Sequence, residues 1–167
     1  PDEKTAKANI DFIFKTVREA DELLVVIISK SGVTVETIAQ AEYLLRELSS
    51  KFSDIEDRVI VITNEESPLA VSAKERNMAV ISIPKQVGGR YSVFSAVGLI
   101  PLMSAGFDVD EFLAGALEMR ALCLSLETEN NPALKSAAFL AYWRKQGKQI
   151  HDSFYFNPEL ESLGKWH

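Results

Sequence analysis

The sequence predicts an α/β fold, a doubly wound three-layer sandwich in which a mainly parallel sheet is flanked by helices. Three apolar runs rich in β-branched residues indicate strands buried on both faces, as in parallel sheets. These runs cover residues 23–28, 59–63 and 78–83. Amphipathic helical patterns separate them, and this alternation is typical of right-handed βαβ crossovers.

The first half of the chain supplies the helices of this alternation. Apolar residues at i, i+3, i+4 and i+7 predict an amphipathic helix over residues 5–20. A second such helix follows the first strand and ends near Ser50. Pro68 suits the first turn of a short third helix that ends near Asn77.

The second half is predicted to be mostly helical. Residues 93–105 are apolar almost all round, which predicts a buried helix. The next helix begins at Asp108 or Asp110, either of which can cap it. Another begins at Pro132 and ends at Gly147.

The last segment is predicted to contain one more strand and one more helix. Alternating apolar residues indicate a fourth strand over 149–156, and a helical piece begins near Pro158. No internal repeat or linker interrupts the pattern. We therefore expect a single domain over residues 1–167, truncated at both ends.

The composition is that of an ordinary soluble domain, with 47% hydrophobic and 25% charged residues. A net charge of −6 argues against nucleic acid or an anionic membrane as a partner. No apolar run has the length of a transmembrane helix. The single cysteine, Cys123, permits no disulfide within the chain and favours a reducing, cytoplasmic compartment.

A hydroxyl-rich turn joins the first strand to the second helix, and it is the main candidate site. The first turn of a helix has unpaired N–H groups and partial positive charge, so such a turn suits an anion. The polar residues and the glycine of this turn are Ser29, Lys30, Ser31, Gly32, Thr34 and Thr37. The expected ligand is a phosphate, although Ser31 and Thr34 could simply cap the helix. The Walker pattern is absent, so a nucleoside triphosphate is not indicated.

A second candidate lies at the mouth of the apolar helix, where Gly88 and Gly89 directly precede Arg90. A charged arginine beside a buried helix is costly unless it is paired or meets a ligand. The alternative is a surface arginine in an ion pair.

Other kinds of site are not indicated. Neither His151 nor His167 has a second histidine or a cysteine at metal-ligand spacing, so no zinc site is expected. Cys123 has no adjacent histidine that would make it a nucleophile. Trp143 and Trp166 are interpreted as packing residues.

Two stretches resemble a known family. Residues 29–37, SKSGVTVET, resemble the phosphate loop of sugar isomerase (SIS) domains, which have a flavodoxin-like fold. Residues 87–98, VGGRYSVFSAVG, are similar to a signature of glucose-6-phosphate isomerase, and the following LIPLMSAGFDVDEFLAGA fits the same family. The resemblance covers nearly the whole chain, as the first of that enzyme's two SIS domains.

The resemblance implies a reaction and its residues. The family interconverts glucose 6-phosphate and fructose 6-phosphate through a cis-enediol(ate), without a metal or other cofactor. By resemblance, the hydroxyl-rich turn holds the substrate phosphate. Arg90 stabilises the enediolate, which suits a permanently charged guanidinium. The backbone at Gly88 and Gly89 allows close approach to the sugar.

The family's catalytic glutamate lies in an ESxGK-type motif, and residues 161–165 spell ESLGK. The surrounding segment resembles instead the helix that precedes the true motif. We therefore expect the base beyond His167 and interpret Glu161 as a solvated helix residue.

Several parts of the family's catalytic set are missing from the sequence. These are a glycine-rich strand before the first helix, the second SIS domain with its lysine, and the histidine from a partner subunit. We expect a fragment of a cytoplasmic homodimeric enzyme, inactive on its own. The alternatives are a phosphosugar-sensing SIS module of a regulator and another SIS-family sugar-phosphate isomerase.

Overall fold

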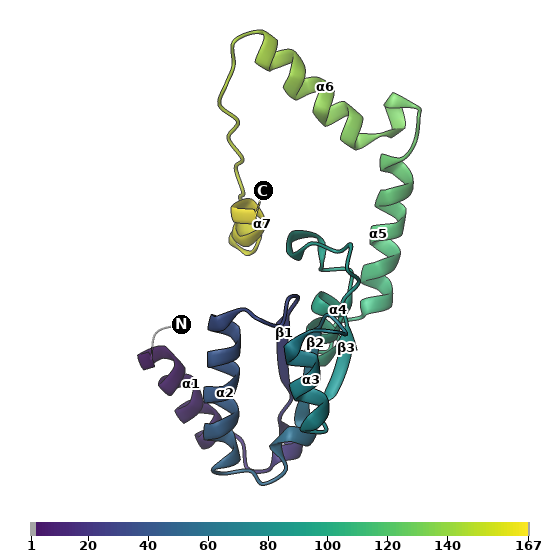
Figure 1. Cartoon of the computed structure of the whole chain (residues 1–167). Coiled ribbons are helices and arrows are strands. Elements are labelled where there is room, and N and C mark those ends of the chain that lie inside the picture. The colour runs from purple at the N-terminus through teal and green to yellow at the C-terminus, as the bar shows by residue number, and fades with distance from the viewer. Residues whose placement is uncertain (1–2, 167) are drawn as a thin grey trace. The chain divides into compact units, whose positions relative to one another are not determined.

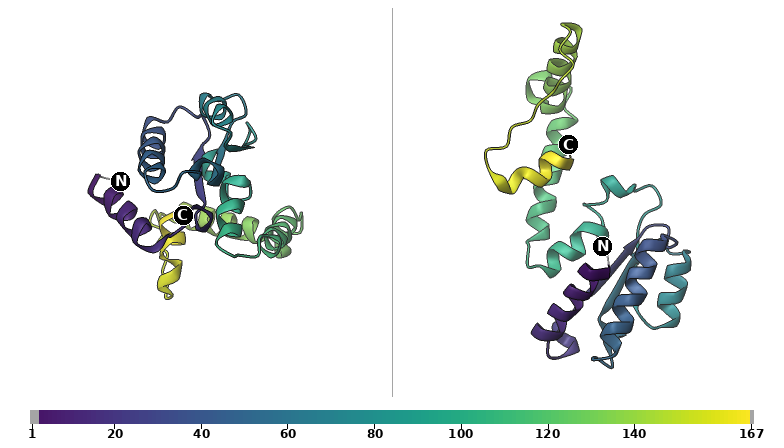
Figure 2. Two further views of the ribbon diagram at one scale, coloured as in Figure 1. Left: turned by 90° about the horizontal axis from the view of Figure 1, so that it is seen from below. Right: turned by 90° about the vertical axis from the view of Figure 1, so that its left-hand side faces the viewer.

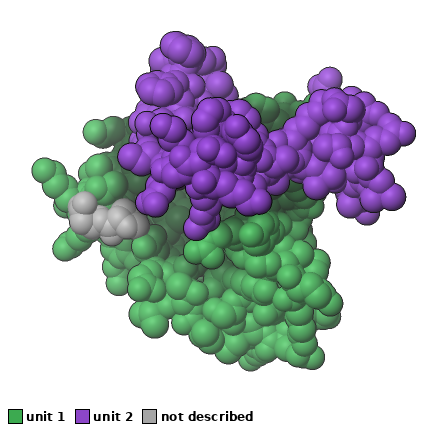
Figure 3. Space-filling model, turned by 90° about the horizontal axis from the view of Figure 1, so that it is seen from above, with its two compact units in different colours: residues 1–110 green, residues 111–167 purple. Residues whose placement is uncertain are grey.

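A computed structural model describes residues 3–166 of the chain. The chain divides into two compact units, residues 1–110 and residues 111–167, which Figure 3 shows in different colours. The first unit holds a sheet and the second is built from helices and loops.

The sheet of the first unit has three parallel strands, β1 (Val25–Ser29), β2 (Val59–Thr63) and β3 (Ala79–Ser82), in the order β1-β2-β3 (Figure 1). In the register, Ser29 lies opposite Thr63, and Thr63 lies opposite Ser82. The carboxyl ends of the strands therefore form one edge. The three predicted strands and the α/β fold class are confirmed.

Helices flank this sheet as the sequence predicts. They are α1 (Glu3–Thr16), α2 (Val35–Ser49), α3 (Pro68–Glu75) and α4 (Ala96–Ser104). Figure 2 shows α2 and α3 on one side of the sheet and α4 on the other. Among the described residues, no helix is long and apolar enough to cross a membrane.

The hydrophobic core of the first unit lies between the sheet and the helices α2 and α3. Leu45 and Leu48 of α2 pack against Val61 of β2, and all three side chains are at most 2% exposed. Phe14 of α1 meets Phe52 edge to face, with ring centroids 6.3 Å apart. Each such side chain contributes about 1.5–3 kcal/mol by leaving water, which explains why these amphipathic patterns decide the fold.

The helix α4 differs from its prediction, because none of its residues is buried. Met103 is 57% exposed, and the rest of the helix is largely half-buried among the described residues. An apolar helix is fully buried only when neighbours cover it on every side, and the described residues cover it in part. Gly98 of this helix lies against the Val93 carbonyl and leaves no room for a Cβ.

The second unit is helical, with α5 (Val109–Cys123) reaching into it from the last residues of the first. It continues with α6 (Pro132–Lys145) and α7 (Glu161–Trp166). Asn131 joins α5 to α6, and its side chain is 2% exposed. Its Nδ2 donates to the carbonyls of Cys123 and Ser125, each at 2.8 Å, and its Oδ1 accepts from the Leu134 N–H at 2.9 Å.

The predicted fourth strand over 149–156 is wrong, because this segment contains no regular secondary structure. Its apolar side chains Ile150, Phe154 and Phe156 are 83%, 82% and 99% exposed. An alternating pattern becomes a strand only when another strand pairs with its backbone, and the described chain pairs none with this segment.

Candidate functional site

The candidate site lies at the carboxyl edge of the sheet. The turn after β1 leads into α2, and the segment 83–95 after β3 leads into α4 (Figure 1). Ligands of open α/β sheets bind at the carboxyl ends of the strands. The two predicted elements, the hydroxyl-rich turn and the arginine segment, therefore belong to the same edge.

The turn after β1, residues 29–34, brings three hydroxyls together; it is called the phosphate loop below, after the ligand that the sequence predicts for it. Ser29 Oγ donates to Thr34 Oγ1 at 3.3 Å, and Ser31 Oγ lies 3.4 Å from the same Thr34 oxygen. Bonds between hydroxyls are usually about 2.7–2.8 Å long. These hydroxyls are thus held close together but bonded weakly, and a stronger acceptor could recruit their hydrogens.

No side-chain hydrogen bond from Thr34 caps the beginning of α2. Thr34 occupies the N-cap position and its carbonyl accepts from the Ile38 N–H at 3.0 Å. Its side chain makes no capping hydrogen bond. The alternative was that Ser31 and Thr34 serve only as helix caps. For Thr34 the structure does not show such a cap. The first turn keeps the partial positive charge that favours an anion.

Gly32 allows the phosphate loop to turn sharply. Its φ is +65°, a conformation that other residues rarely adopt. A Cβ at this position would lie 2.6 Å from both Cβ and Oγ of Ser67. Both the positive φ and the contact with Ser67 therefore require glycine at this position.

Lys30 connects the two parts of the candidate site. Its Nζ donates to the main-chain carbonyl of Lys85 at 2.8 Å, in the segment that follows β3. Its own carbonyl accepts from the Asn64 N–H at 3.1 Å, in the turn after β2. Lys30 therefore links the loops that follow all three strands.

Thr37 is placed apart from the other hydroxyls. It is half-buried and lines a groove beside β1 together with Ile28 and Leu44. Among the described residues, no hydrogen bond joins its hydroxyl to Ser29, Ser31 or Thr34.

Arg90 lies in a short 3-10 helix, Gly89–Tyr91, and its side chain is exposed. Within residues 3–166 its guanidinium forms no ion pair and no hydrogen bond. The expected cost of burying this charge therefore does not arise in this structure, and the alternative of a surface ion pair is not observed either. The turn itself is held by Ser92 Oγ, which donates to the Gly89 carbonyl at 2.6 Å.

The glycines before Arg90 are not required by packing. A Cβ at Gly89 would meet nothing within 4 Å, and one at Gly88 would only touch the Tyr91 ring at 3.8 Å. Neither residue has a positive φ. Nothing in the described chain demands glycine at these two positions, in contrast to Gly32.

Sequence analysis missed a group of polar residues at the end of β2. Thr63 and Ser67 are buried and form hydrogen bonds behind the phosphate loop. The Oδ1 of Asn64 is buried without a hydrogen-bond partner among the described residues. The sequence contained a signal for this group. In a parallel sheet the ends of neighbouring strands lie side by side, so the polar residues that end β2 and begin the next turn are expected beside the loop that follows β1.

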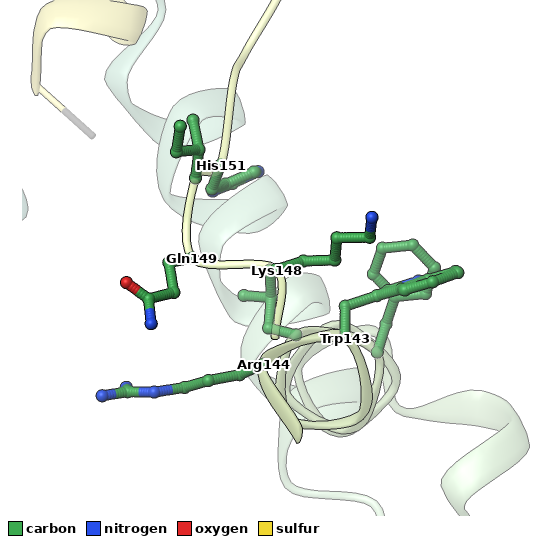
Figure 4. A pocket seen from close by; sticks show the side chains of 8 residues that line it. Trp143, Arg144, Lys148, Gln149 and His151 are labelled. Carbon is green, nitrogen blue, oxygen red and sulfur yellow. The ribbon is translucent and has the colours of Figure 1, made fainter. Parts of the chain in front are cut away.

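A hollow in the second unit forms no convergent site. It lies between the end of α6 and the segment 148–151, and Figure 4 shows its lining residues. Arg144 and Gln149 point to one side, whereas Trp143 and Lys148 point to the other. Within residues 3–166, no group of three or more His, Cys, Asp or Glu side chains could hold a metal ion.

Comparison with known proteins identifies the family. The family model described as phosphoglucose isomerase matches residues 6–166. The chain belongs to the phosphoglucose isomerase family. A glucose-6-phosphate isomerase from Methanocaldococcus jannaschii is 36% identical over 149 residues, which cover 89% of this chain and 37% of that protein.

Solved structures agree with this membership. A hypothetical protein from Thermus thermophilus superposes with a TM-score of 0.72 and 35% identity, covering 82% of this chain and 33% of that one. A glucose-6-phosphate isomerase from Chlamydia trachomatis gives a TM-score of 0.67 and 30% identity, covering 83% and 26%. The chain thus spans about a third of the length of the relatives that it matches.

Within the phosphoglucose isomerase family, the ESxGK-like residues of α7 need separate attention. Glu161 is exposed and pairs with Lys165 across one helical turn, with Oε1 and Nζ 2.6 Å apart. This is the environment predicted for a solvated helix residue. The location of the catalytic base beyond His167 stays a prediction.

Proposed function

We propose that the protein carrying this chain is an aldose–ketose isomerase that interconverts glucose 6-phosphate and fructose 6-phosphate. The observation that carries the proposal is the family match over residues 6–166. The hydroxyl-lined loop at the carboxyl edge of the sheet supports it, because it offers donors to a phosphate where parallel sheets bind ligands.

The phosphate of the sugar binds at the phosphate loop. The hydroxyls of Ser29, Ser31 and Thr34 donate to its oxygens. The family resemblance adds Thr37 and Lys30 as further donors. The first turn of α2 adds its partial positive charge.

The reaction moves a proton between C1 and C2 of the opened sugar. A base removes the proton from C2 of glucose 6-phosphate, and negative charge develops on the enediolate oxygens. Arg90 stabilises this charge with its fixed donors, and Gly88 and Gly89 let the backbone approach the sugar. The base returns the proton to C1, and the hydroxyl proton moves from O2 to O1, so no other reactant is consumed. The base lies outside this chain.

The complete enzyme acts as a homodimer in the cytoplasm, and the isolated chain binds the sugar phosphate weakly without turning it over. These points are proposed from the family resemblance and from the share of its relatives' length, about a third, that the chain spans.

The test is an activity assay on a protein of the relatives' length that contains this chain. We expect conversion of glucose 6-phosphate to fructose 6-phosphate that survives addition of a metal chelator. A preference for mannose 6-phosphate or an amino sugar phosphate would favour another isomerase. Binding without any turnover would favour a phosphosugar-sensing module.

A further inference from the structure

Two buried hydroxyls behind the phosphate loop have no part in the proposed chemistry. Thr63 at the end of β2 is fully buried, and Ser67 in the following turn is 5% exposed. We infer that Thr63 and Ser67 are positioning residues that hold the phosphate loop in its binding conformation, an inference that rests on the proposed function.

The hydrogen bonds of this pair have only one consistent direction. Thr63 Oγ1 lies 2.6 Å from the main-chain carbonyl of Ser29, which can only accept, so Thr63 donates. Its single hydrogen is then used, and Ser67 Oγ must donate to Thr63 Oγ1 at 2.8 Å. Ser67 Oγ accepts from the Ala70 N–H at 3.1 Å. A directed chain therefore runs from the start of α3 to the end of β1.

This chain ends on the peptide group that begins the phosphate loop. The Ser29 carbonyl also accepts from the Gly32 N–H at 3.2 Å, so it receives two hydrogen bonds. A carbonyl with two donors is fixed in orientation, and it fixes the peptide that joins Ser29 to Lys30. The hydroxyl that bonds to Thr34 belongs to Ser29 as well, so fixing the Ser29 backbone also restricts the position of this hydroxyl.

Ser67 also supports the loop by contact. The missing Cβ of Gly32 would lie 2.6 Å from the Ser67 side chain, so the loop rests directly on it. The sheet itself does not need these hydroxyls, because valine has the shape of threonine and suits a strand equally well. The Ser67 hydroxyl also caps α3, because it accepts from the Ala70 N–H, whereas the Thr63 hydroxyl is explained by the loop that it holds.

The test uses the 167-residue chain in titrations followed by NMR, with inorganic phosphate and glucose 6-phosphate as ligands. Thr63→Val keeps the shape and removes the hydroxyl, whereas Thr63→Ser keeps the hydroxyl. We expect Thr63→Val to weaken the binding of both ligands by the same factor, about tenfold, since the Ser29 carbonyl loses one of its two donors and the loop loses its fixed orientation. Thr63→Ser should bind within about twofold of the original chain.

Ser67→Ala provides a second variant in case Thr63→Val does not fold. It leaves the Thr63–Ser29 bond in place, so we expect a smaller loss, about threefold in affinity. A purely structural role would lower the unfolding midpoint and leave the affinity of the folded protein unchanged.

Unchanged affinities in the folded Thr63→Val variant, or in Ser67→Ala if only that one folds, would overturn the positioning role and leave the proposed function standing. Binding of neither ligand by the original chain would count against the phosphate loop as a binding site, and the inference would fail with it.

Discussion

The ammonium of Lys30 donates to the main-chain carbonyl of Lys85 at 2.8 Å, although the two residues are 55 positions apart. This bond joins the phosphate loop to the segment that leads to Arg90. Lys85 uses its own ammonium elsewhere, in an exposed pair with Glu66 at 3.2 Å. The link therefore depends on the side chain of Lys30 and only on the backbone of Lys85.

Replacing Lys30 by methionine removes this link while keeping an unbranched chain. We expect weaker binding of glucose 6-phosphate, by about tenfold, because a charged donor near the phosphate is lost. The amide shifts of Gly88 and Gly89 should change with it in the NMR spectrum of the ligand-free chain. Lys85→Ala is the matched control, since it keeps the carbonyl, and it should leave both measurements nearly unchanged.

Arg90→Lys tests the assignment of the enediolate-stabilising residue. A lysine keeps the charge but loses the planar fork, so turnover should fall by about a hundredfold while KM changes little. Steady-state kinetics on a protein of the relatives' length would measure this. Arg46→Lys, in an exposed pair with Glu47, should have normal kinetics. Near-normal turnover of Arg90→Lys would refute the role.

Glycines 32 and 89 should respond differently to alanine. Gly32→Ala meets both a positive φ and the Ser67 side chain, so it should destabilise the chain by about 2 kcal/mol and impair phosphate binding. Gly89→Ala meets nothing, so stability should change by less than about 0.5 kcal/mol while sugar phosphate binding falls. Denaturant unfolding and an NMR titration separate the two. Undiminished binding by Gly89→Ala would argue against close approach of a sugar there.

Asn131→Ala should destabilise the second unit. Its buried side chain makes three hydrogen bonds between α5 and α6, and their loss should cost about 2 kcal/mol. Asn130→Ala is the control, because within residues 3–166 that exposed side chain bonds only to Glu127. Hydrogen exchange of the α6 amides would detect the change, and equal effects of the two variants would contradict the prediction.

Glu22 should give a small pH-dependent contribution to stability. The backbone N–H of Arg18, followed by that of Glu19, lowers the pKa of its carboxyl below 4.5 in the folded chain. A lowered folded pKa means that the contribution is present above pH 4.5 and is lost as the pH falls through the folded value. Glu22→Ala should therefore unfold earlier than the original chain at neutral pH, and the difference should vanish in acid. A difference that persists in acid would exclude the carboxylate as its source.

Much of the fold follows from local patterns in the chain. Apolar runs located all three strands, and helical periodicity located α1 and α2 to within a few residues. Two expectations failed for a shared reason. The segment 149–156 and the helix α4 both carry apolar residues that become buried only if other segments pack against them. The apolar pattern in the sequence does not show whether such packing partners are present.

The sequence by itself determined the parallel α/β layout, the place of the phosphate loop and the likeness to one family, because these depend on the order of residues along the chain. Only the tertiary structure decided that Lys30 reaches Lys85, that Thr63 and Ser67 lie behind Ser29, and that Arg90 is exposed. Such contacts join residues far apart in the chain, so the packing of the strands and not the local pattern sets them.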